Sequence, residues 1–548
     1  MTTVSITGTG TVTSPSFNGV GTVTGELTFE FVGFDGSGVT NVTSAIAVAL
    51  STGDVYLPPG FIWLVSNLTI PPGRMLYGPG SLKVAAGADF GVALGSGSVL
   101  DGPTVFESAG GFTGHAVRIS AGSAFARVEN ATVRISGSSS IGVSIEAGAT
   151  DPYVSRTKVF RTAGTPYAGI LLRGTIRASV VGCMVDGPTY GVFGFGYRDS
   201  IIANNKCTNN VIGIGALSQR AQHPTICSGN TITGNAVYNA SEESISLDST
   251  GNEPAQWPEN GTLPVATVAS AADTSGARCT ITISETTGAS NWCNGYMLIV
   301  LSGSAAGTCA EIEASTSNTI GVSRSGGFDA AMITAGTKLQ ITLPFINNSI
   351  TGNTVQSATD SSWGIRLYGA CWHNVVANNT VTTMLPPLSC NSVVDDTLGS
   401  SGAWKAASWS GFNSFVGNTI RQHKANTAST YGPIWSDVYG LGTPWVNVSY
   451  LAKAYAHFRN VFRGNHIAGG ARPFFRGAGT IIEDNILAGS NGIYTNNAIN
   501  SRLFGNINSP SNNVGVYYEE GTTGTNILDP NAVANLVKSA SVGTGYGW

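Results

Sequence analysis

The chain has 548 residues, of which 42% are apolar, 11% are charged and 72 are glycine, and its net charge is −4. This composition argues against disorder, which goes with low hydrophobicity and high charge. The chain has no basic run, so nucleic acid is not expected as a partner, because phosphate binding needs clustered Lys and Arg. No stretch approaches the roughly 18 apolar residues of a membrane span. The start, Met1-Thr-Thr-Val-Ser-Ile6, lacks the pattern of a secretory signal, so we expect synthesis in a reducing cytosol.

The first 50 residues predict a short β segment and then one helix. Residues 1–33 are rich in alternating Thr, Val and Gly, which is typical of short strands. Between residues 43 and 50 the apolar residues recur at helical spacing, so the pattern predicts an amphipathic helix with Thr43 or Ser44 as its N-cap. Strands are predicted next, within 54–60, 68–73 and 76–84.

Residues 34–83 resemble the entry to the β-helices of the pectate-lyase superfamily as it occurs in bacteriophage tailspikes. The resemblance lies in Asp35-Gly36, the short helix, Val55-Tyr-Leu-Pro-Pro-Gly60 and the turn Leu76-Tyr-Gly-Pro-Gly80. It implies a right-handed parallel β-helix whose open N-terminal edge the helix covers. It also implies a homotrimer in the virion, made in the host cytoplasm and joined to the phage tail or an adaptor by residues 1–33. The acidic pair often found before the helix is replaced by Asn41-Val42, so no function is assigned to that position.

From about residue 90 onward a repeat runs along the chain. Gly followed by an aliphatic residue recurs at 142, 169, 191, 213, 364, 492 and 515, with neighbouring copies 27, 22, 22 and 23 residues apart. Asn, a small or polar residue and an aliphatic residue recur from positions 230, 353, 379, 418 and 465. A repeat of this length predicts single layers that are stable only when stacked. Because the units are β-rich and broken by Gly, Asn and Ser, they predict an all-β fold, the parallel β-helix.

Two interruptions of the repeat divide the chain into regions. We expect a β-helix with a capping helix over 34–252, and an inserted small β-domain over 253–345, where the strands have a different rhythm. The β-helix resumes over 346–510 and includes a Trp-rich segment at 385–460. Residues 511–548 lose the Asn signature and are expected to cap or assemble the molecule. A long irregular segment such as 385–460 favours a functional role.

The cysteines and histidines do not indicate a metal or a cofactor. The eight cysteines show no C-x-x-C spacing, and the six histidines show no metal-ligand spacing. Cys183, Cys207 and Cys227 are 24 and 20 residues apart, about one layer each. We interpret them as small buried fillers stacked along the β-helix, with a disulfide as the alternative.

Four carboxylates are the candidate catalytic residues. The densest acidic group is Glu242-Glu243-Ser-Ile-Ser-Leu-Asp248, in which Ile245 and Leu247 are predicted to point inward. Strand alternation then sends Ser244, Ser246 and Asp248 to the outer surface. After the insertion, Asp360 precedes a strand with the same signature. Aligning Ile245 with Ile365 places Ser246 beside Arg366 and Asp248 beside Tyr368.

Glycoside hydrolysis needs two carboxyl groups, and neighbouring layers can bring two together. The segment Glu242-Glu243-Ser-Ile-Ser-Leu resembles the Asp-Asp-Cys-x-x-Ile segment of polygalacturonases, which implies one of the two glutamates as acid and the other as an aid in positioning water. The further acid one layer earlier in those enzymes is absent, so Asp360 or a carboxylate of a neighbouring subunit would substitute. Alternatively, these residues are solvated turn residues, and Arg366 simply pairs with Glu243 or Asp360. Asp395, Asp396 and Asp437 form a second candidate site.

Aromatic and cationic residues near these carboxylates are the candidate sugar-binding groups. Trp363, Trp404 and Trp409 offer flat amphipathic faces for sugar rings, although packing between subunits would use the same side chains. Arg366 and Tyr368 complete the set.

The predicted function is that of a phage tailspike that binds and depolymerises a bacterial surface polysaccharide, capsule or O-antigen, by endo-glycosidic hydrolysis. The first alternative is a polysaccharide lyase, in which Arg366 or Lys405 neutralises a uronate. The second is a non-catalytic receptor-binding fibre. A secreted bacterial enzyme is a further alternative, against which the lack of a signal sequence argues.

Overall fold

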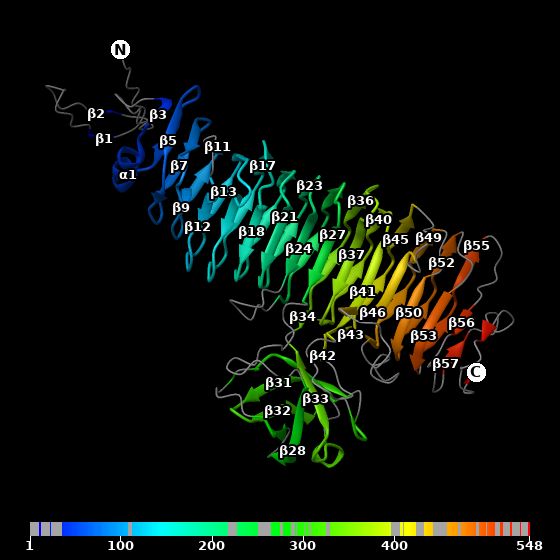
Figure 1. The fold of residues 1–548 in the computed structure, drawn as a ribbon. Helices are drawn as coiled ribbons and strands as arrows, with labels where there is room; N and C mark the ends of the chain where they lie inside the picture. Colours follow the sequence, from blue (N-terminus) through cyan, green and yellow to red (C-terminus); the bar gives the residue numbers. More distant parts are fainter. Residues whose placement is uncertain are drawn as a thin grey trace. The chain divides into compact units, whose positions relative to one another are not determined.

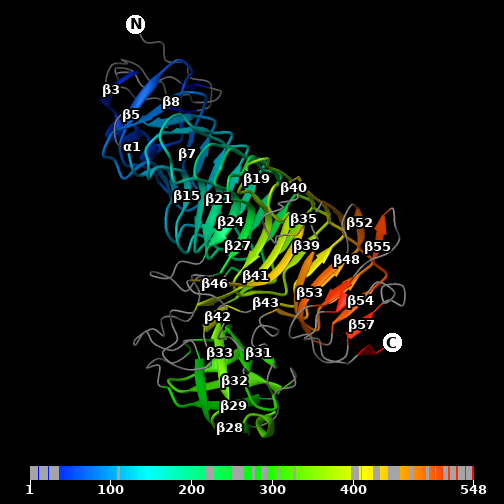
Figure 2. The ribbon, with the colours of Figure 1, turned by 45° about the vertical axis from the view of Figure 1, so that its right-hand side comes forward.

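The structure is a computed structural model that divides into two compact units, Met1–Gly213 and Ile214–Trp548. It describes residues 10–11, 22–23, 36–107, 112–217, 227–249, 265–274, 278–285, 291, 293–300, 302–305, 308–324, 329–342, 344–395, 406–408, 410–423, 432–441, 457–469, 473–488, 493–499, 501–509, 516–518, 526–528, 537–538 and 546–547. Within each unit, short strands of successive layers lie side by side in parallel ladders (Figure 1, Figure 2). Each layer contributes to three sheets, here called sheets 1, 2 and 3.

The first unit contains strands of all three sheets, each paired in parallel with the layers before and after it. Sheet 1 consists of β4 (Val55–Tyr56), β7 (Met75–Tyr77), β10 (Val99–Asp101), β13 (Arg127–Glu129), β16 (Tyr153–Ser155), β19 (Ser179–Val181) and β22 (Ile201–Ala203). Sheet 2 consists of β3 (Ser37–Asn41), β5 (Ile62–Val65), β8 (Ser81–Val84), β11 (Thr104–Glu107), β14 (Thr132–Ile135), β17 (Lys158–Arg161), β20 (Met184–Asp186) and β23 (Lys206–Thr208). Sheet 3 consists of β6 (Leu68–Ile70), β9 (Phe90–Leu94), β12 (His115–Ile119), β15 (Ile141–Ile145), β18 (Ala168–Arg173) and β21 (Tyr190–Phe195). Strand β24 (Ile212–Leu217) begins in this unit and ends in the next.

Aliphatic side chains stack in register inside the coil of the first unit. Leu100 pairs with Val128, Val128 with Val154, and Val154 with Val180, and all four side chains are fully buried. Because the layers of a parallel sheet lie about 4.8 Å apart, each layer covers the apolar residue of the one before it. The repeat therefore builds one continuous core.

The predicted helix is present as α1 (Thr43–Thr52), and it packs against β4 and β6. Its residues Ile46 and Leu50 are fully buried, as the amphipathic pattern predicted. The predicted N-cap was wrong: the N-cap is Val42, which makes no side-chain cap bond. Instead, the Asn41 Oδ1 accepts a hydrogen bond from the Thr43 amide at 3.0 Å, and the Thr43 hydroxyl accepts one from the Ser66 amide. Thr43 is thus used to bind the next layer.

The second unit has the same three sheets. Sheet 1 consists of β25 (Thr231–Thr233), β35 (Ser349–Thr351), β39 (Val375–Ala377), β44 (Ser414–Val416), β48 (Val461–Arg463), β51 (Ile481–Glu483), β54 (Arg502–Phe504), β57 (Asn526–Leu528) and β59 (Tyr546–Gly547). Sheet 2 consists of β26 (Ala236–Tyr238), β36 (Thr354–Gln356), β40 (Thr380–Thr383), β45 (Thr419–Gln422), β49 (His466–Ala468), β52 (Ile486–Ala488) and β55 (Ile507–Ser509). Sheet 3 consists of β27 (Glu243–Asp248), β37 (Trp363–Tyr368), β41 (Leu388–Asp395), β46 (Ile434–Leu441), β50 (Phe474–Ala478), β53 (Ile493–Ile499), β56 (Val516–Tyr518) and β58 (Val537–Lys538).

Short strands lead from sheet 3 into sheet 1 in this unit, namely β34 (Phe345–Ile346), β38 (Cys371–Trp372), β43 (Ser410–Gly411) and β47 (His457–Phe458). Strand β42 (Ala406–Ser408) runs antiparallel to β41. Strands of all three sheets therefore occur within the Trp-rich segment 385–460. Strands β56 to β59, within residues 511–548, also pair in parallel with the preceding layers.

The Asn signature of the sequence corresponds to two ladders of buried asparagines in the second unit. Within each ladder, every Asn Nδ2 except the last donates to the Oδ1 of the Asn in the next layer, at 2.8 to 3.1 Å. One ladder is Asn230, Asn348, Asn374, Asn413 and Asn460. The other is Asn235, Asn353, Asn379, Asn418, Asn465, Asn485 and Asn506. The residue before each Asn of the second ladder has a positive φ, which explains why Gly, Asn or Asp stands there.

The Gly–aliphatic signature has a different cause, which is the close approach of successive strands in sheet 3. A Cβ built on Gly142 would lie 2.5 Å from the carbonyl oxygen of Gly169 in the next layer. A Cβ on Gly364 would overlap the carbonyl oxygen of Pro387. Neither glycine has a positive φ, so the missing side chain, and not the backbone conformation, is what these positions require.

Residues 265–342 form an antiparallel barrel with its own core, which is the inserted β-domain that the changed strand rhythm predicted. The order is β28 (Val265–Thr274), β29 (Arg278–Ile283), β32 (Thr319–Ser323), β31 (Cys309–Ser315), β30 (Met297–Val300) and β33 (Lys338–Thr342), and β33 pairs with β28. A 3₁₀ helix, η3 (Ala330–Met332), precedes β33. Leu298, Ile312 and Ile341 lie in the barrel core. The predicted class, an all-β parallel β-helix with an inserted small β-domain, is confirmed.

The cysteine interpretation was right in one part and wrong in another. Cys183, Cys207 and Cys227 are buried and carry free thiols. Burial raises the pKa of the Cys207 thiol to about 12. However, Cys183 and Cys207 do not stack on each other. Cys207 in β23 pairs with Val185 in β20, whereas the Cys183 amide donates to Asn205. Each thiol therefore fills a different column of the core.

The ends of the chain are described only in short pieces. Within residues 1–33, β1 (Gly10–Thr11) pairs antiparallel with β2 (Thr22–Val23). Among the residues that the structure describes, no helix is long and apolar enough to cross a membrane.

Candidate functional site

The predicted alignment of the two acidic layers in sheet 3 of the second unit is confirmed. Strands β27 and β37 are parallel neighbours, with Ile245 opposite Ile365, Ser246 opposite Arg366 and Asp248 opposite Tyr368. Ile245 and Leu247 are fully buried and form part of the core. The alternate residues therefore lie on the outer face, namely Ser246 and Asp248 of β27 and Arg366 and Tyr368 of β37.

Arg366 is the centre of the group on this face. Its guanidinium donates to Glu243 Oε1 at 2.5 Å. The central carbon of this guanidinium, Cζ, lies 3.8 Å from the centre of the Tyr368 ring and 4.8 Å from that of the Trp363 ring. Both are cation–π distances. We call these four residues together with Asp248 the Arg366 cluster.

The electrostatics of the cluster keep Arg366 cationic. Burial by itself lowers the pKa of the Arg366 guanidinium, but the charges of Glu243, Tyr368 and Asp248 and the bond from Glu243 outweigh it, so the pKa is raised. The side chains of Arg366 and Glu243 are only 13% and 10% exposed. A buried cation of this kind is stable only because its carboxylate partner is held beside it. Of the two ordinary pairings considered from the sequence, the one with Glu243 is present.

The prediction that Ser244 and Ser246 are exposed on the outer surface was wrong. Ser244 is fully buried and Ser246 is 1% exposed. Side chains of adjacent layers are only about 4.8 Å apart, so the large Arg366 opposite Ser246 covers the small residue. Asp248 remains partly exposed at the end of the strand.

Glu242 and Asp360 lie in the turns that lead into β27 and β37, and both are exposed. These turns are stacked: the Ser361 hydroxyl donates to the Ser241 carbonyl at 2.7 Å, and the Trp363 amide donates to the Glu242 carbonyl at 2.6 Å. In the described part of the chain, no ion pair joins either carboxylate to Arg366. The structure thus brings Glu243 and Asp248 to the cluster and leaves Glu242 and Asp360 at its entrance.

The outer face continues into the next layers of sheet 3. Arg366 is followed in register by Ser389 and Trp435, and Tyr368 by Asn391 and Asp437. The Trp435 ring stacks on Phe474 with 4.4 Å between ring centres. Asp437 of the second candidate site therefore stands in the same column as Asp248. Asp395 lies in β41, opposite Leu441 of β46. Asp396, Trp404, Lys405 and Trp409 lie outside the described residues.

The first unit contains a group that reasoning from the sequence missed. His115 Nδ1 lies 2.5 Å from the Ser144 hydroxyl and 3.2 Å from Glu146 Oε1, and Arg173 lies 3.4 Å from Glu146 Oε2. Burial by itself raises the pKa of Glu146. The bond from His115, the charges of Arg173 and His115 and the Ser144 hydroxyl lower it by more, so the net effect is a lowered pKa. The four side chains come from three successive layers of sheet 3, and Glu146 is a solitary acid that an inspection of dense acidic segments does not find. The available sequence signal was that Glu146 lies two residues after Ser144, so strand alternation predicts both side chains on the same outer face.

Aromatic rings lie at the Arg173 layer and in the layer after it: Tyr167 directly precedes β18, and Tyr190 and Phe193 lie in β21. Tyr190 packs edge-on against Tyr167 with 5.0 Å between ring centres, and stacks on Phe193 at 4.2 Å. Burial raises the pKa of Tyr167 to about 12, so its hydroxyl stays protonated at neutral pH. Tyr167 and Tyr190 are partly exposed and provide amphipathic surface, whereas Phe193 is fully buried beneath them.

The fold defines the class of the protein as a parallel β-helix. No protein-family model matches the sequence, and a search of curated proteins finds no match. Solved structures with a similar fold include the A-module of the mannuronan C-5 epimerase AlgE4 of Azotobacter vinelandii, at 13% identity and a TM-score of 0.44, covering 90% of this chain and 97% of that one. A variant of the tailspike protein of E. coli bacteriophage HK620, in complex with a pentasaccharide, is 8% identical with a TM-score of 0.46, covering 92% of this chain and 78% of that one. A variant of the periplasmic alginate epimerase AlgG is 11% identical with a TM-score of 0.39, covering 90% of each chain. Likenesses this distant carry no inference about activity.

Proposed function

We propose that this chain binds a bacterial surface polysaccharide, capsule or O-antigen, and cleaves it by endo-glycosidic hydrolysis at the Arg366 cluster. The observation that carries the proposal is the guanidinium of Arg366 held against Glu243 and two aromatic rings on the outer face of sheet 3. Aromatic faces pack against the C–H faces of sugars, and charged groups bond their hydroxyls. Such a face on a long sheet suits a polymer more than a small molecule.

The pair of carboxylates proposed for the chemistry is Glu243 and Asp248, which flank Arg366. In hydrolysis one carboxyl group protonates the glycosidic oxygen, and the other activates the attacking water or attacks the sugar itself. The two residues are five positions apart in one strand, so their backbones are about 16 Å apart at 3.3 Å per residue. Glu243 bonds the Arg366 guanidinium directly, and the charge of Asp248 also acts on it, so these two carboxylates are the ones proposed for the pair. The proposal leaves Glu242 and Asp360 outside the reacting pair, because both are exposed in turns.

Hydrolysis is favoured over elimination by the state of Arg366. A lyase needs a cation that neutralises the substrate carboxylate, and the charge of Arg366 is already balanced by Glu243. The proposal further includes a homotrimer carried in the virion and attached to the phage tail by the N-terminal segment, as the resemblance of residues 34–83 implies.

The test uses the full chain and a panel of capsules and O-antigens from candidate hosts. Polysaccharides that bind are identified first, and each is then incubated with the protein and analysed for new reducing ends. Hydrolysis gives reducing ends without unsaturated sugars, whereas products with ultraviolet absorbance from a new double bond would show a lyase. Binding without any new ends on every bound polysaccharide would overturn the enzymatic proposal and leave the receptor-binding fibre.

A further inference from the structure

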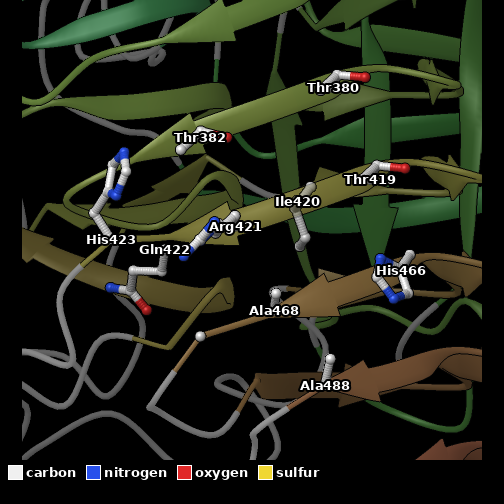
Figure 3. A pocket seen from close by; sticks show the side chains of 11 residues that line it. Thr380, Thr382, Thr419, Ile420, Arg421, Gln422, His423, His466, Ala468 and Ala488 are labelled. Carbon is white, nitrogen blue, oxygen red and sulfur yellow. The ribbon is translucent and has the colours of Figure 1, made fainter. Parts of the chain in front are cut away.

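Sheet 2 of the second unit carries a hollow on its outer face, separate from sheet 3. The hollow has a volume of about 570 Å³, which is within the range of small-ligand sites. It is lined by β40, β45, β49 and β52, and Figure 3 shows the side chains around it. None of the roles proposed above uses these residues.

Strand register explains how the hollow forms. Thr382, Arg421, Ala468 and Ala488 follow one another in one column across four layers. The long side chain of Arg421 is therefore succeeded by two methyl groups, as Figure 3 shows, and the hollow lies beside it. At the rim, Gly469 has a φ of +150°, and a Cβ there would lie 3.0 Å from Gln422 Cβ, so a larger residue is disfavoured at this edge.

A second column supplies hydrogen-bonding groups along one side. Thr380, Thr419 and His466 stand opposite one another in three layers, as Figure 3 shows. Their side chains are exposed, and the spacing between them is about 4.8 Å. Two hydroxyl groups and one imidazole thus line the hollow in a straight row.

The hollow is lined by one cationic side chain and two imidazoles. Arg421, His423 and His466 line it, and no carboxylate is among the lining residues. Within the described residues, no ion pair engages Arg421, in contrast to Arg366 of the cluster on sheet 3. A guanidinium beside imidazoles and hydroxyls suits a ligand with both a carboxylate and hydroxyl groups, because Arg binds carboxylates through two parallel bonds. The alanine floor suits the C–H face of a sugar ring.

We infer that this hollow, with Arg421 as its anion-binding residue, is a second saccharide site that holds a carboxylate-bearing sugar unit without cleaving it. The choice of a saccharide rests on the proposed function, whereas the preference for an anion rests on the lining residues alone. A site of this kind on another sheet would retain a polymer after each cleavage.

The experiment measures binding of trigalacturonate, and of galactotriose as the neutral probe, to the full chain by calorimetry. We expect saturable binding of trigalacturonate and at least about tenfold weaker binding of galactotriose, because the charged bond to Arg421 is lost. Arg421→Gln and Ala468→Leu should each weaken trigalacturonate binding to a similar extent, the first by removing the charge and the second by filling the hollow. Arg134→Gln is the matched control, because Arg134 is an exposed arginine on β14 of sheet 2 in the first unit.

Equal binding of trigalacturonate by Arg421→Gln and the unmodified chain would overturn the inference, as would equal binding of the neutral probe. Competition by inorganic phosphate as strong as by trigalacturonate would also overturn it, because it would indicate a general anion site. Cleavage is not measured here, so the outcome is distinct from failure of the proposed function. A chain that cleaves no polysaccharide, but loses trigalacturonate binding on Arg421→Gln, would still support the second site.

Discussion

At the scale of single residues, the Arg366 cluster combines burial with chemistry. Glu243 and Arg366 form an ion pair that is almost fully covered, and Asp248 lies at its partly exposed side. Removing one member of a buried pair costs more than the pair contributes, because it leaves the other charge without compensation. Changes in activity at this site must therefore be separated from changes in folding.

For the reacting pair, we expect Asp248→Asn to lower kcat at least about 100-fold, since removal of an acid or base has effects of this size. Glu243→Gln should lower it as much and should also cost about 3 kcal/mol of unfolding free energy, because Arg366 loses its carboxylate. Reducing-end assays and denaturant unfolding measure the two effects. The matched control is Glu242→Gln, an exposed neighbour that should change neither quantity. Full activity in Asp248→Asn would remove Asp248 from the reacting pair.

The Glu146 group of the first unit makes stability depend on pH. Because the folded state lowers the pKa of Glu146 below its ordinary value of 4.5, the stabilisation is fully present above pH 4.5 and is lost as the pH falls below it. Glu146→Gln should therefore be about 1.5–3 kcal/mol less stable than the unmodified chain at pH 7, the size of a hydrogen bond to a charged group. The difference should shrink as the pH is lowered below 4.5, and unfolding curves at several pH values measure it.

The control for this pH effect is Glu313→Gln, which removes an exposed ion pair with Arg278 in the barrel. Exposed pairs contribute little, so this variant should show almost no difference at any pH. A constant gap for Glu146→Gln between pH 7 and pH 3 would contradict the assignment of the effect to carboxylate ionisation.

At the scale of elements, the asparagine ladders explain how layers of unequal length stay in register. Asn379 accepts bonds from the amide and the side chain of Asn353, and it donates to Asn418 and to the Ile350 carbonyl. Every one of these groups is buried, so each rung of the ladder satisfies the polar groups of its neighbours.

Asn379→Ala should cost about 3 kcal/mol of unfolding free energy, because it leaves buried donors of Asn353 without an acceptor. The adjacent Thr380→Ala changes an exposed side chain and should cost less than about 0.5 kcal/mol. Denaturant unfolding of the two variants measures the difference. Equal stability would show that the ladder does not hold the layers together.

The glycines of sheet 3 give a second test at this scale. Gly364→Ala forces a methyl group against the Pro387 carbonyl and the Val381 side chain, and it should cost about 1–3 kcal/mol through overpacking. Gly53→Ala is the matched control, since its backbone is extended and a Cβ there meets nothing within 4 Å. Thermal unfolding measures both, and a tolerated Gly364→Ala would contradict the close approach as the reason for the signature.

At the scale of the whole molecule, the strand register indicates that the insertion can be deleted without changing any layer of the β-helix. Asp248 pairs with Tyr368, and Phe345 pairs with Cys371. In the later layer, two residues, Gly369-Ala370, join the corresponding strands. Deleting residues 250–343 leaves Ser249-Pro344, also two residues, between Asp248 and Phe345.

We therefore expect the deletion of residues 250–343, with Gly-Ala in place of Ser249-Pro344, to fold as a parallel β-helix. The Asn230–Asn348 and Asn235–Asn353 bonds already join the layers on the two sides of the insertion. Far-ultraviolet circular dichroism should retain the β signal, and thermal unfolding should remain cooperative. Aggregation or loss of the β signal would show that the barrel is required for the coil to form.

Much of the fold was predictable because it depends on local rules that recur in every layer. A glycine is needed where strands approach closely, a residue tolerant of positive φ is needed before a ladder Asn, and aliphatic residues are needed inward. Gly364, Asn379 and Ile245 each carry one of these rules, so their spacing predicted the coil. The register of β27 on β37 followed from the same signatures across the insertion.

The candidate site was predictable only in part, because its contacts join residues at irregular sequence separations. Arg366 is 123 residues from Glu243, and Arg173 is 27 residues from Glu146. Both pairs use the same geometry of adjacent layers, yet only the tertiary structure decides which outward side chains meet and how deeply they are covered. The sequence by itself determined the repeating layer and its alignment, since these follow from constraints within and between neighbouring strands. The choice of Glu243 over Asp360 as the partner of Arg366, the burial of Ser246 and the hollow beside Arg421 depended on side-chain sizes in the neighbouring layers, which only the folded coil brings together.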